Sequence, residues 1–240
     1  KHWTAVLERQ PDFYEAHCNL GAVLAELGRY EEAEKHFRRS LELNPDFSQA
    51  HEHLARLAAL AGRKAEEVFH KGELVRLDPG YARARNNYGL ALLSAGKAGE
   101  AAGQFKEAIA LRPGLAEPHS NLGMALYTLG KREEAVEAFR VALKIDPSLA
   151  EAHNNMGMAL LSLGRAAEAE QSFRSAVGLK GREVPFHLNW GIAAANAGKY
   201  AEAELHLRDA LALAPDNPQV KQTLESVLQL KKNAGVPAGK

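Results

Sequence analysis

The 240-residue sequence has very little cysteine, few aromatic residues and no excess of charge of either sign. Cys18 is the single cysteine, which excludes an internal disulfide and any cysteine-rich metal module. Thirty Lys and Arg residues balance thirty Asp and Glu residues, so we expect no nucleic-acid binding of the kind that depends on excess positive charge. No apolar run reaches the roughly 18 residues of a membrane-spanning helix, so we expect no membrane contact by this segment.

The sequence opens with Lys1, His2 and Trp3, without a starting Met and without the pattern of a signal peptide. We therefore expect a cytoplasmic protein, with a missing upstream signal or anchor as the alternative. Abundant Ala and Leu favour a helical fold.

One unit recurs every 34 residues along most of the chain. The clearest markers are six glycines in phase: Gly28, Gly62, Gly96, Gly130, Gly164 and Gly198. Prolines mark the end of most units: Pro45, Pro79, Pro113, Pro147 and Pro215, with Gly181 in place of the fifth. We number the six copies one to six, and the residues within a copy as positions 1 to 34; the copies span residues 14–47, 48–81, 82–115, 116–149, 150–183 and 184–217.

Each copy predicts two helices, as copy four illustrates. Leu122 and Leu126 recur at helical spacing, and Gly130 ends this helix because glycine adopts the left-handed backbone of a tight helix end. Ala135 and Phe139 begin the apolar face of a second helix, which Pro147 ends. A glycine or alanine at position 8 and an alanine at position 20 predict a close approach of the two helices.

The ends of the chain and copy two depart from this pattern. Residues 1–13 predict the second helix of a truncated copy, residues 218–230 a capping helix with a polar outer face, and residues 231–240 a loose tail. In copy two, Glu67 and Lys71 replace the expected Ala and Phe. We expect a rotated or poorly packed second helix there, weakened further by Gly72.

The repeat resembles the tetratricopeptide repeat (TPR) family over about nine-tenths of the chain. Copy four carries the matching residues Leu122, Gly123, Tyr127, Gly130, Ala135, Phe139, Ala142 and Pro147. The resemblance implies an all-α fold, a right-handed α-solenoid of stacked helical hairpins. It also implies that the first helices line a concave groove that binds peptide segments.

Positions 5, 6, 9 and 12 of the first helices lie on the side opposite the second helix, at about 100° per residue. Position 6 is asparagine in five copies, which helix propensity does not explain. Amides there can pair with the main chain of an extended peptide, and neighbouring apolar side chains can form adaptable pockets. The predicted peptide-binding residues are Asn19, His53, Asn86, Asn87, Leu90, Asn121, Met124, Tyr127, Asn154, Asn155, Met158, Leu161, Asn189 and Ile192. The alternative is that each Asn bonds a neighbouring helix backbone and that the methionines fill gaps between first helices.

These patterns predict a protein-interaction scaffold that binds an extended or short helical segment of another protein, centred on copies three to five. The asparagine ladder is similar to that of the repeat arm of O-linked N-acetylglucosamine transferases, so the alternative function is a non-catalytic, substrate-presenting arm of a larger enzyme. A further alternative is self-association through the solenoid ends. Histidines at position 4 lie a whole repeat apart and cannot share an ion, so we expect no metal site. The sequence has no Ser, His and Asp set and no carboxylate pair beyond a single repeat position copied along the chain, so we expect no enzymatic activity and no cofactor.

Overall fold

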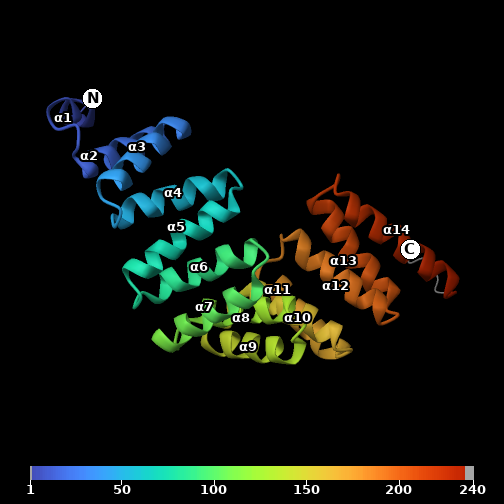
Figure 1. Ribbon diagram of the computed structural model, residues 1–240. Coiled ribbons are helices and arrows are strands. Elements are labelled where there is room, and N and C mark those ends of the chain that lie inside the picture. The colour runs from blue at the N-terminus through green and yellow to red at the C-terminus, as the bar shows by residue number, and fades with distance from the viewer. Residues whose placement is uncertain (1, 236–240) are drawn as a thin grey trace. The chain divides into compact units, whose positions relative to one another are not determined.

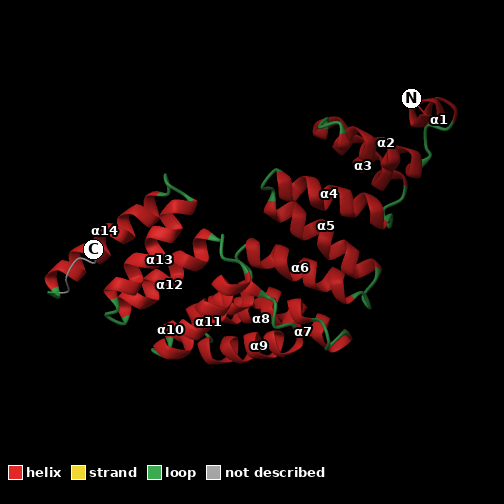
Figure 2. Ribbon diagram, turned by 180° about the vertical axis from the view of Figure 1, so that it is seen from behind, coloured by secondary structure: helices red, strands yellow, loops and turns green. Residues whose placement is uncertain are grey.

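The computed structural model describes residues 2–235, and in that part of the chain every regular element is an α-helix (Figure 1, Figure 2). Residue 1 of the predicted half repeat and residues 236–240 of the predicted tail lie outside the described residues. The helices divide between two compact units, residues 1–113 and 114–240. The predicted all-α repeat fold is confirmed.

The first unit holds the short N-terminal helix and the hairpins of copies one to three. Its helices are α1 (His2–Arg9), α2 (Tyr14–Glu26), α3 (Tyr30–Leu43), α4 (Ser48–Leu60), α5 (Lys64–Leu77), α6 (Ala82–Ser94) and α7 (Ala98–Leu111). Within each copy the two helices pack together, and α3 contacts α4 while α5 contacts α6, so consecutive hairpins stack. Phe37 and Leu54 are fully buried in the core that α2, α3 and α4 share.

The second unit holds copies four to six and a final helix. Its helices are α8 (Ala116–Thr128), α9 (Arg132–Ile145), α10 (Ala150–Ser162), α11 (Ala166–Leu179), α12 (Val184–Asn196), α13 (Tyr200–Leu213) and α14 (Pro218–Asn233). One continuous apolar core runs through it from Leu126 to Val227. Consecutive first helices α8, α10 and α12 also touch one another, which places their solvent-facing sides next to each other.

Glycine ends the first helix of every copy by adopting a backbone that other residues avoid. Gly130 has φ +78°, and the amide of Lys131 donates back to the carbonyl of Leu126 over 2.9 Å, which closes the last turn of α8. The equivalent glycines of the other five copies share this positive φ. The 34-residue glycine spacing therefore fixes where each hairpin turns.

The close approach of paired helices takes place between a glycine and an aromatic ring. A Cβ atom on Gly123 would lie 2.7 Å from the ring of Phe139, which is closer than atoms pack. The same contact recurs at Gly21, Gly89 and Gly157, and in copy six Leu207 takes the place of the ring. The large counterpart of position 8 is thus the residue at position 24; the alanine that the sequence suggested, at position 20, lies beside the contact.

The last helix is longer than the sequence predicted. We expected the cap to end at Leu230 and a loose tail to begin at Lys231, but α14 continues to Asn233. Lys231 is buried, and its ammonium donates to the carboxylate of Glu204 on α13 over 2.9 Å. This buried ion pair, together with two lysines at the negative end of the helix dipole, holds the additional turn.

Candidate functional site: the first-helix face and a cavity in copy two

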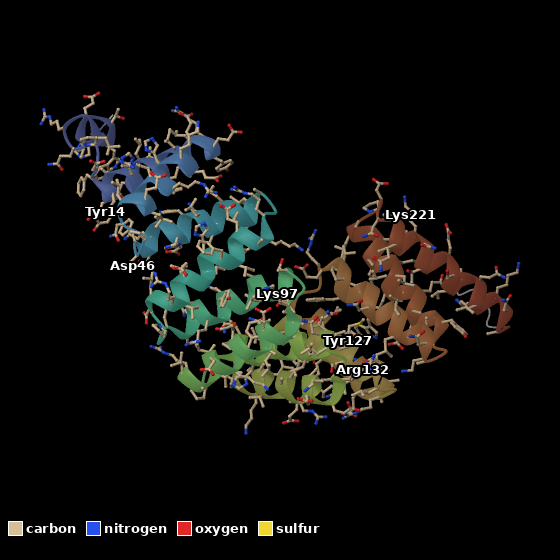
Figure 3. All side chains as sticks on the ribbon, viewed as in Figure 1. Tyr14, Asp46, Lys97, Tyr127, Arg132 and Lys221 are labelled. Carbon is tan, nitrogen blue, oxygen red and sulfur yellow. The ribbon has the colours of Figure 1, made fainter. Side chains whose placement is uncertain are left out.

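A cavity of about 760 Å³ lies in the first unit, bordered by α4, α5 and α6. Its lining residues are Asp46, Ser48, Glu52, Ala55, Arg56, Ala59, Lys71, Leu74, Leu77, Asp78, Tyr81, Ala84 and Asn87. Figure 3 labels Asp46, which lies just before α4. Several of these residues occupy positions 5, 6, 9 and 12, which the sequence assigned to the binding face.

The cavity coincides with the two departures of copy two from the repeat. Ala55 stands at position 8, where other copies have glycine, and Lys71 stands at position 24, where other copies have Phe or Leu. The Lys71 ammonium pairs with Glu67 over 2.5 Å and is half-buried. The flexible, charged side chain of Lys71 thus replaces the ring that fills the equivalent space in other copies. The apolar residues of α4 and α5 therefore border the cavity instead of packing against a ring.

Helix α5 is correspondingly poor in buried side chains. Only His70 and Val75 are buried along it, whereas the corresponding helix of copy four, α9, buries five residues. Phe69, which lies two positions before Lys71, is 59% exposed. Copy two therefore has a second helix of normal length whose apolar residues do not line up on the inner face.

In the first unit the predicted site residues have unequal surroundings. Asn87 is exposed and lines the cavity. The ring of His53 stacks on Phe37 with centroids 4.6 Å apart, so it packs against copy one and closes the core. Asn19, Asn86 and Leu90 are half-buried on α2 and α6.

In the second unit three predicted asparagines form one hydrogen-bonded line. Asn189 donates from Nδ2 to Oδ1 of Asn154 over 3.0 Å, and Asn154 donates from Nδ2 to Oδ1 of Asn155 over 3.3 Å. Asn154 is buried between the other two, which are half-buried. These bonds join side chain to side chain across α10 and α12, and they fix the orientation of the outer amides.

The predicted apolar residues of the second unit partly belong to its core. Met124, Tyr127, Met158, Leu161 and Ile192 are half-buried and pack against the buried cluster of this unit. Tyr127 is labelled in Figure 3, near the end of α8. Asn121 on the same helix is half-buried. These side chains present one part of their surface to solvent and use the rest for packing.

The histidines at position 4 hold each first helix to the loop before it. The Nε2 atoms of His17, His51, His153 and His187 lie 2.8 to 3.1 Å from the carbonyl oxygen six residues earlier, to which they donate. Arg85 makes the same bond to the carbonyl of Pro79 in copy three. This repeated bond gives the position-4 side chains a structural role at the start of the first helices.

Cys18 does not contribute reactive chemistry to the first-helix face. Its side chain is 1% exposed, and burial raises the pKa of its thiol to about 11. The thiolate that would react is therefore scarce at neutral pH.

Sequence reasoning missed Arg56 and Lys71 as parts of a candidate site. Both departures were visible, since Arg56 is the one charged residue in the apolar column at position 9 and Lys71 breaks the column of large apolar residues. Comparing one repeat position at a time does not show that Arg56, Lys71 and Ala55 border the same cavity.

In the described part of the chain, no helix is both long and apolar enough to cross a membrane.

Comparisons with known proteins agree with this architecture. Family models described as tetratricopeptide repeat or TPR repeat match residues 14–47, 72–116, 123–164, 150–182 and 184–217. The chain is thus a repeat protein whose described residues form only helices as regular elements, and it belongs to the tetratricopeptide repeat family. No curated protein matches the chain closely enough to count as a relative.

Solved structures share the fold at low sequence identity. The Cut9 and Hcn1 hetero-tetramer of the APC/C gives a TM-score of 0.72 at 18% identity, covering 94% of this chain and 45% of that one. PilF of Pseudomonas aeruginosa gives 0.69 at 21% identity, covering 91% and 99%. YrrB, described as a TPR protein with an unusual peptide-binding site, gives 0.57 at 20% identity, covering 79% and 97%. This chain therefore spans less than half the length of the first of these.

Proposed function

We propose that this chain is a scaffold that binds an extended segment of another protein and anchors one large apolar side chain of that segment in the copy-two cavity. TPR proteins as a class act as protein-interaction scaffolds, and YrrB has a peptide-binding site by its description. The observation that carries the proposal is the 760 Å³ cavity on the predicted binding face, where the repeat omits its own aromatic ring.

The walls of the cavity suit an apolar anchor. Ala55, Ala59, Leu74 and Ala84 supply hydrocarbon from three helices. In copies one, three, four and five the equivalent contact surrounds a phenylalanine that is fully buried. A partner's Phe or Leu would gain about 1.5–3 kcal/mol from full burial there.

Polar groups at the edge of the cavity suit the main chain of the same segment. Asn87 is exposed and offers two N–H donors and a carbonyl acceptor. Glu52 and Arg56 are exposed on α4, one turn apart, and can bond peptide groups on either side of the anchor. Each such bond adds about 0.5–1.5 kcal/mol, and ordering the peptide consumes part of the gain, so we expect micromolar affinity.

The amides of the second unit offer a separate contact of the same kind. The line from Asn189 through Asn154 to Asn155 uses one N–H of Asn189 and the carbonyl of Asn155. These two bonds leave the N–H groups of Asn155 and the carbonyl of Asn189 unused, and both side chains are half-buried. Because hydrogen bonds already hold these amides, they lose less side-chain entropy when a peptide binds than mobile surface amides would lose.

The test of the anchor fills the cavity from within the protein. Peptides are selected from a phage-displayed library against the full chain, and the affinities of the synthetic peptides are measured by fluorescence anisotropy. The double variant Ala55→Gly with Lys71→Phe restores the regular repeat and places a ring where the anchor would sit. We expect its affinity to fall at least about 10-fold, since the burial of the anchor is lost.

The matched control is Phe69→Ala, which removes an exposed ring from the same helix outside the cavity lining. It should bind like the unchanged chain. A folded double variant with unchanged affinity would remove the cavity from the proposal. Replacing Asn155 and Asn189 together by Ala then tests the amide contact separately, because neither residue lies in the first unit.

A further inference from the structure

Three copies pair a histidine at position 4 with a histidine at position 23 of the second helix. In copy one the Nδ1 atoms of His17 and His36 are 3.0 Å apart, and in copy two those of His51 and His70 are 2.9 Å apart. Each of these pairs shares one proton in a direct hydrogen bond. Both Nδ1 atoms are therefore satisfied, and neither Nδ1 has a lone pair available to a further ligand.

The pair in copy six is built differently. His187 and His206 are 94% and 92% buried, and neither Nδ1 atom has a hydrogen-bond partner among the residues that the structure describes. The carboxylate of Asp209 faces both: its Oδ2 lies 3.7 Å from Nδ1 of His187 and 3.9 Å from Nδ1 of His206. Three ligand atoms of the types that transition metals prefer thus lie within 4.8 Å of one another.

The second nitrogen of His187 determines which tautomer it adopts. Its Nε2 donates to the carbonyl of Gly181 over 3.1 Å, so in the neutral ring Nδ1 carries the lone pair. A metal-bound histidine usually donates its other ring N–H to a carbonyl or carboxylate in this way, which fixes the orientation of the ring. The ring of His206 is held in place by stacking on Trp190, with centroids 3.7 Å apart.

The surroundings of His206 also favour its neutral ring. Burial and the neighbouring His187 lower the pKa of His206, with Asp209 and Glu202 acting in the opposite direction. Neutral imidazole is the form that binds a metal ion. Two buried nitrogens without partners among the described residues otherwise cost free energy.

We propose that His187, His206 and Asp209 form a binding site for a divalent transition-metal ion of the Zn²⁺ type. Tetrahedral ligands at bonds of about 2.0–2.1 Å lie about 3.4 Å apart. The two distances from Asp209 Oδ2 to the histidine Nδ1 atoms, 3.7 and 3.9 Å, are close to this spacing, and the exposed Asp209 side chain has room to adjust. Three protein ligands leave a fourth position for water or a partner's side chain. The ion would link α12 to α13 in the last full copy.

Trp190 provides a direct readout of metal binding to the full chain. Co²⁺ quenches tryptophan fluorescence at close range, and the Trp190 ring stacks on a proposed ligand. We expect saturable quenching with a stoichiometry of one Co²⁺ per chain, reversed by Zn²⁺, together with the visible absorption of tetrahedral Co²⁺. The variant Trp3→Phe removes the only other tryptophan and should leave the titration unchanged.

Three substitutions separate this site from other histidines. Asp209→Asn changes a half-exposed side chain, so the fold should be retained, and we expect at least about 10-fold weaker Co²⁺ binding. His206→Gln should abolish it. His70→Gln, in the pair whose nitrogens already bond each other, is the control and should have no effect. Absence of one-to-one binding, or binding that survives both Asp209→Asn and His206→Gln in folded protein, would overturn the proposal.

Discussion

Copies two and four have the same backbone plan but differ in what lies between their helices. Both consist of a 13-residue helix, a turn with a glycine at positive φ and a 14-residue helix. In copy four Phe139 presses against Gly123, and nothing of that contact is exposed. In copy two Lys71 and Ala55 stand at the same places and border a cavity. The hairpin shape therefore comes from the glycine and proline positions, while the stability of its interior depends on the pair at positions 8 and 24.

The comparison is tested most strongly by removing the ring of copy four. Phe139 is fully buried, so Phe139→Ala should lower the free energy of unfolding by about 3–5 kcal/mol through lost burial and a new cavity. Lys71→Ala, at the same position of copy two, should change it by less than about 1 kcal/mol. Chemical denaturation measures both. Equal effects would mean that copy two depends on position 24 as much as copy four does.

Lowering the pH should reduce the stability of copy two through a histidine that copy four lacks. His70 is buried against His51, with Glu66, Glu73 and Arg38 also nearby, while copy four has Ala138 at this position. Because His51 donates from Nε2 to Pro45, its Nδ1 accepts the proton of His70 Nδ1. Burial, followed by the charge of His51, lowers the pKa of His70 from 6.5 to about 4.

The direction of this pH dependence follows from which state of the chain, folded or unfolded, binds the proton. Between pH 6.5 and about 4 the unfolded chain holds a proton on residue 70 that the folded chain does not, so stability is complete above pH 6.5 and falls by up to about 3 kcal/mol as the pH drops to 4. Hydrogen exchange followed by mass spectrometry should show α4 and α5 losing protection first. His70→Gln should remove this part of the pH dependence; its persistence would assign the effect to another group.

Enlarging the small residue at position 8 tests the contact between positions 8 and 24 from the other helix. A Cβ at Gly123 would lie 2.7 Å from the Phe139 ring, so Gly123→Ala should destabilise the protein by about 1–3 kcal/mol even though alanine is the better helix former. Ala55→Gly in copy two relieves no contact and should cost only the helix propensity, about 1 kcal/mol. Thermal unfolding of the two variants gives the comparison. A neutral Gly123→Ala would show that the ring can move aside.

The fold could be predicted from the sequence because the glycines and prolines that mark each repeat each act through a single, local physical effect. Gly130 and its equivalents need positive φ, and Pro147 ends a helix wherever it stands, so spacing alone placed the hairpins. The site was harder because it depends on combinations. His53 stands in the asparagine column, yet it stacks on a ring of the preceding copy, which no column reveals. His187 and His206 are 19 residues apart, so their pairing does not appear when residues 34 positions apart are compared.

The smallest effect is expected from converting copy two into a regular copy. Lys71→Phe alone fills the cavity, but its ring would meet the Cβ of Ala55 at the distance that glycine avoids elsewhere. The variant should therefore change stability little. Adding Ala55→Gly removes the obstacle, and the double variant should gain about 1 kcal/mol, since burial of the ring outweighs the lost pair with Glu67 and the added glycine.

A double-mutant cycle measured by denaturation isolates the coupling between the two positions. A favourable coupling of about 1–2 kcal/mol is expected if positions 8 and 24 act as one unit. Additive effects would mean that the cavity of copy two has a shape of its own, set by Leu74 and Tyr81 rather than by the missing glycine and ring. In that case the ring of Lys71→Phe would occupy other space, and the peptide anchor would have to be sought along those two side chains.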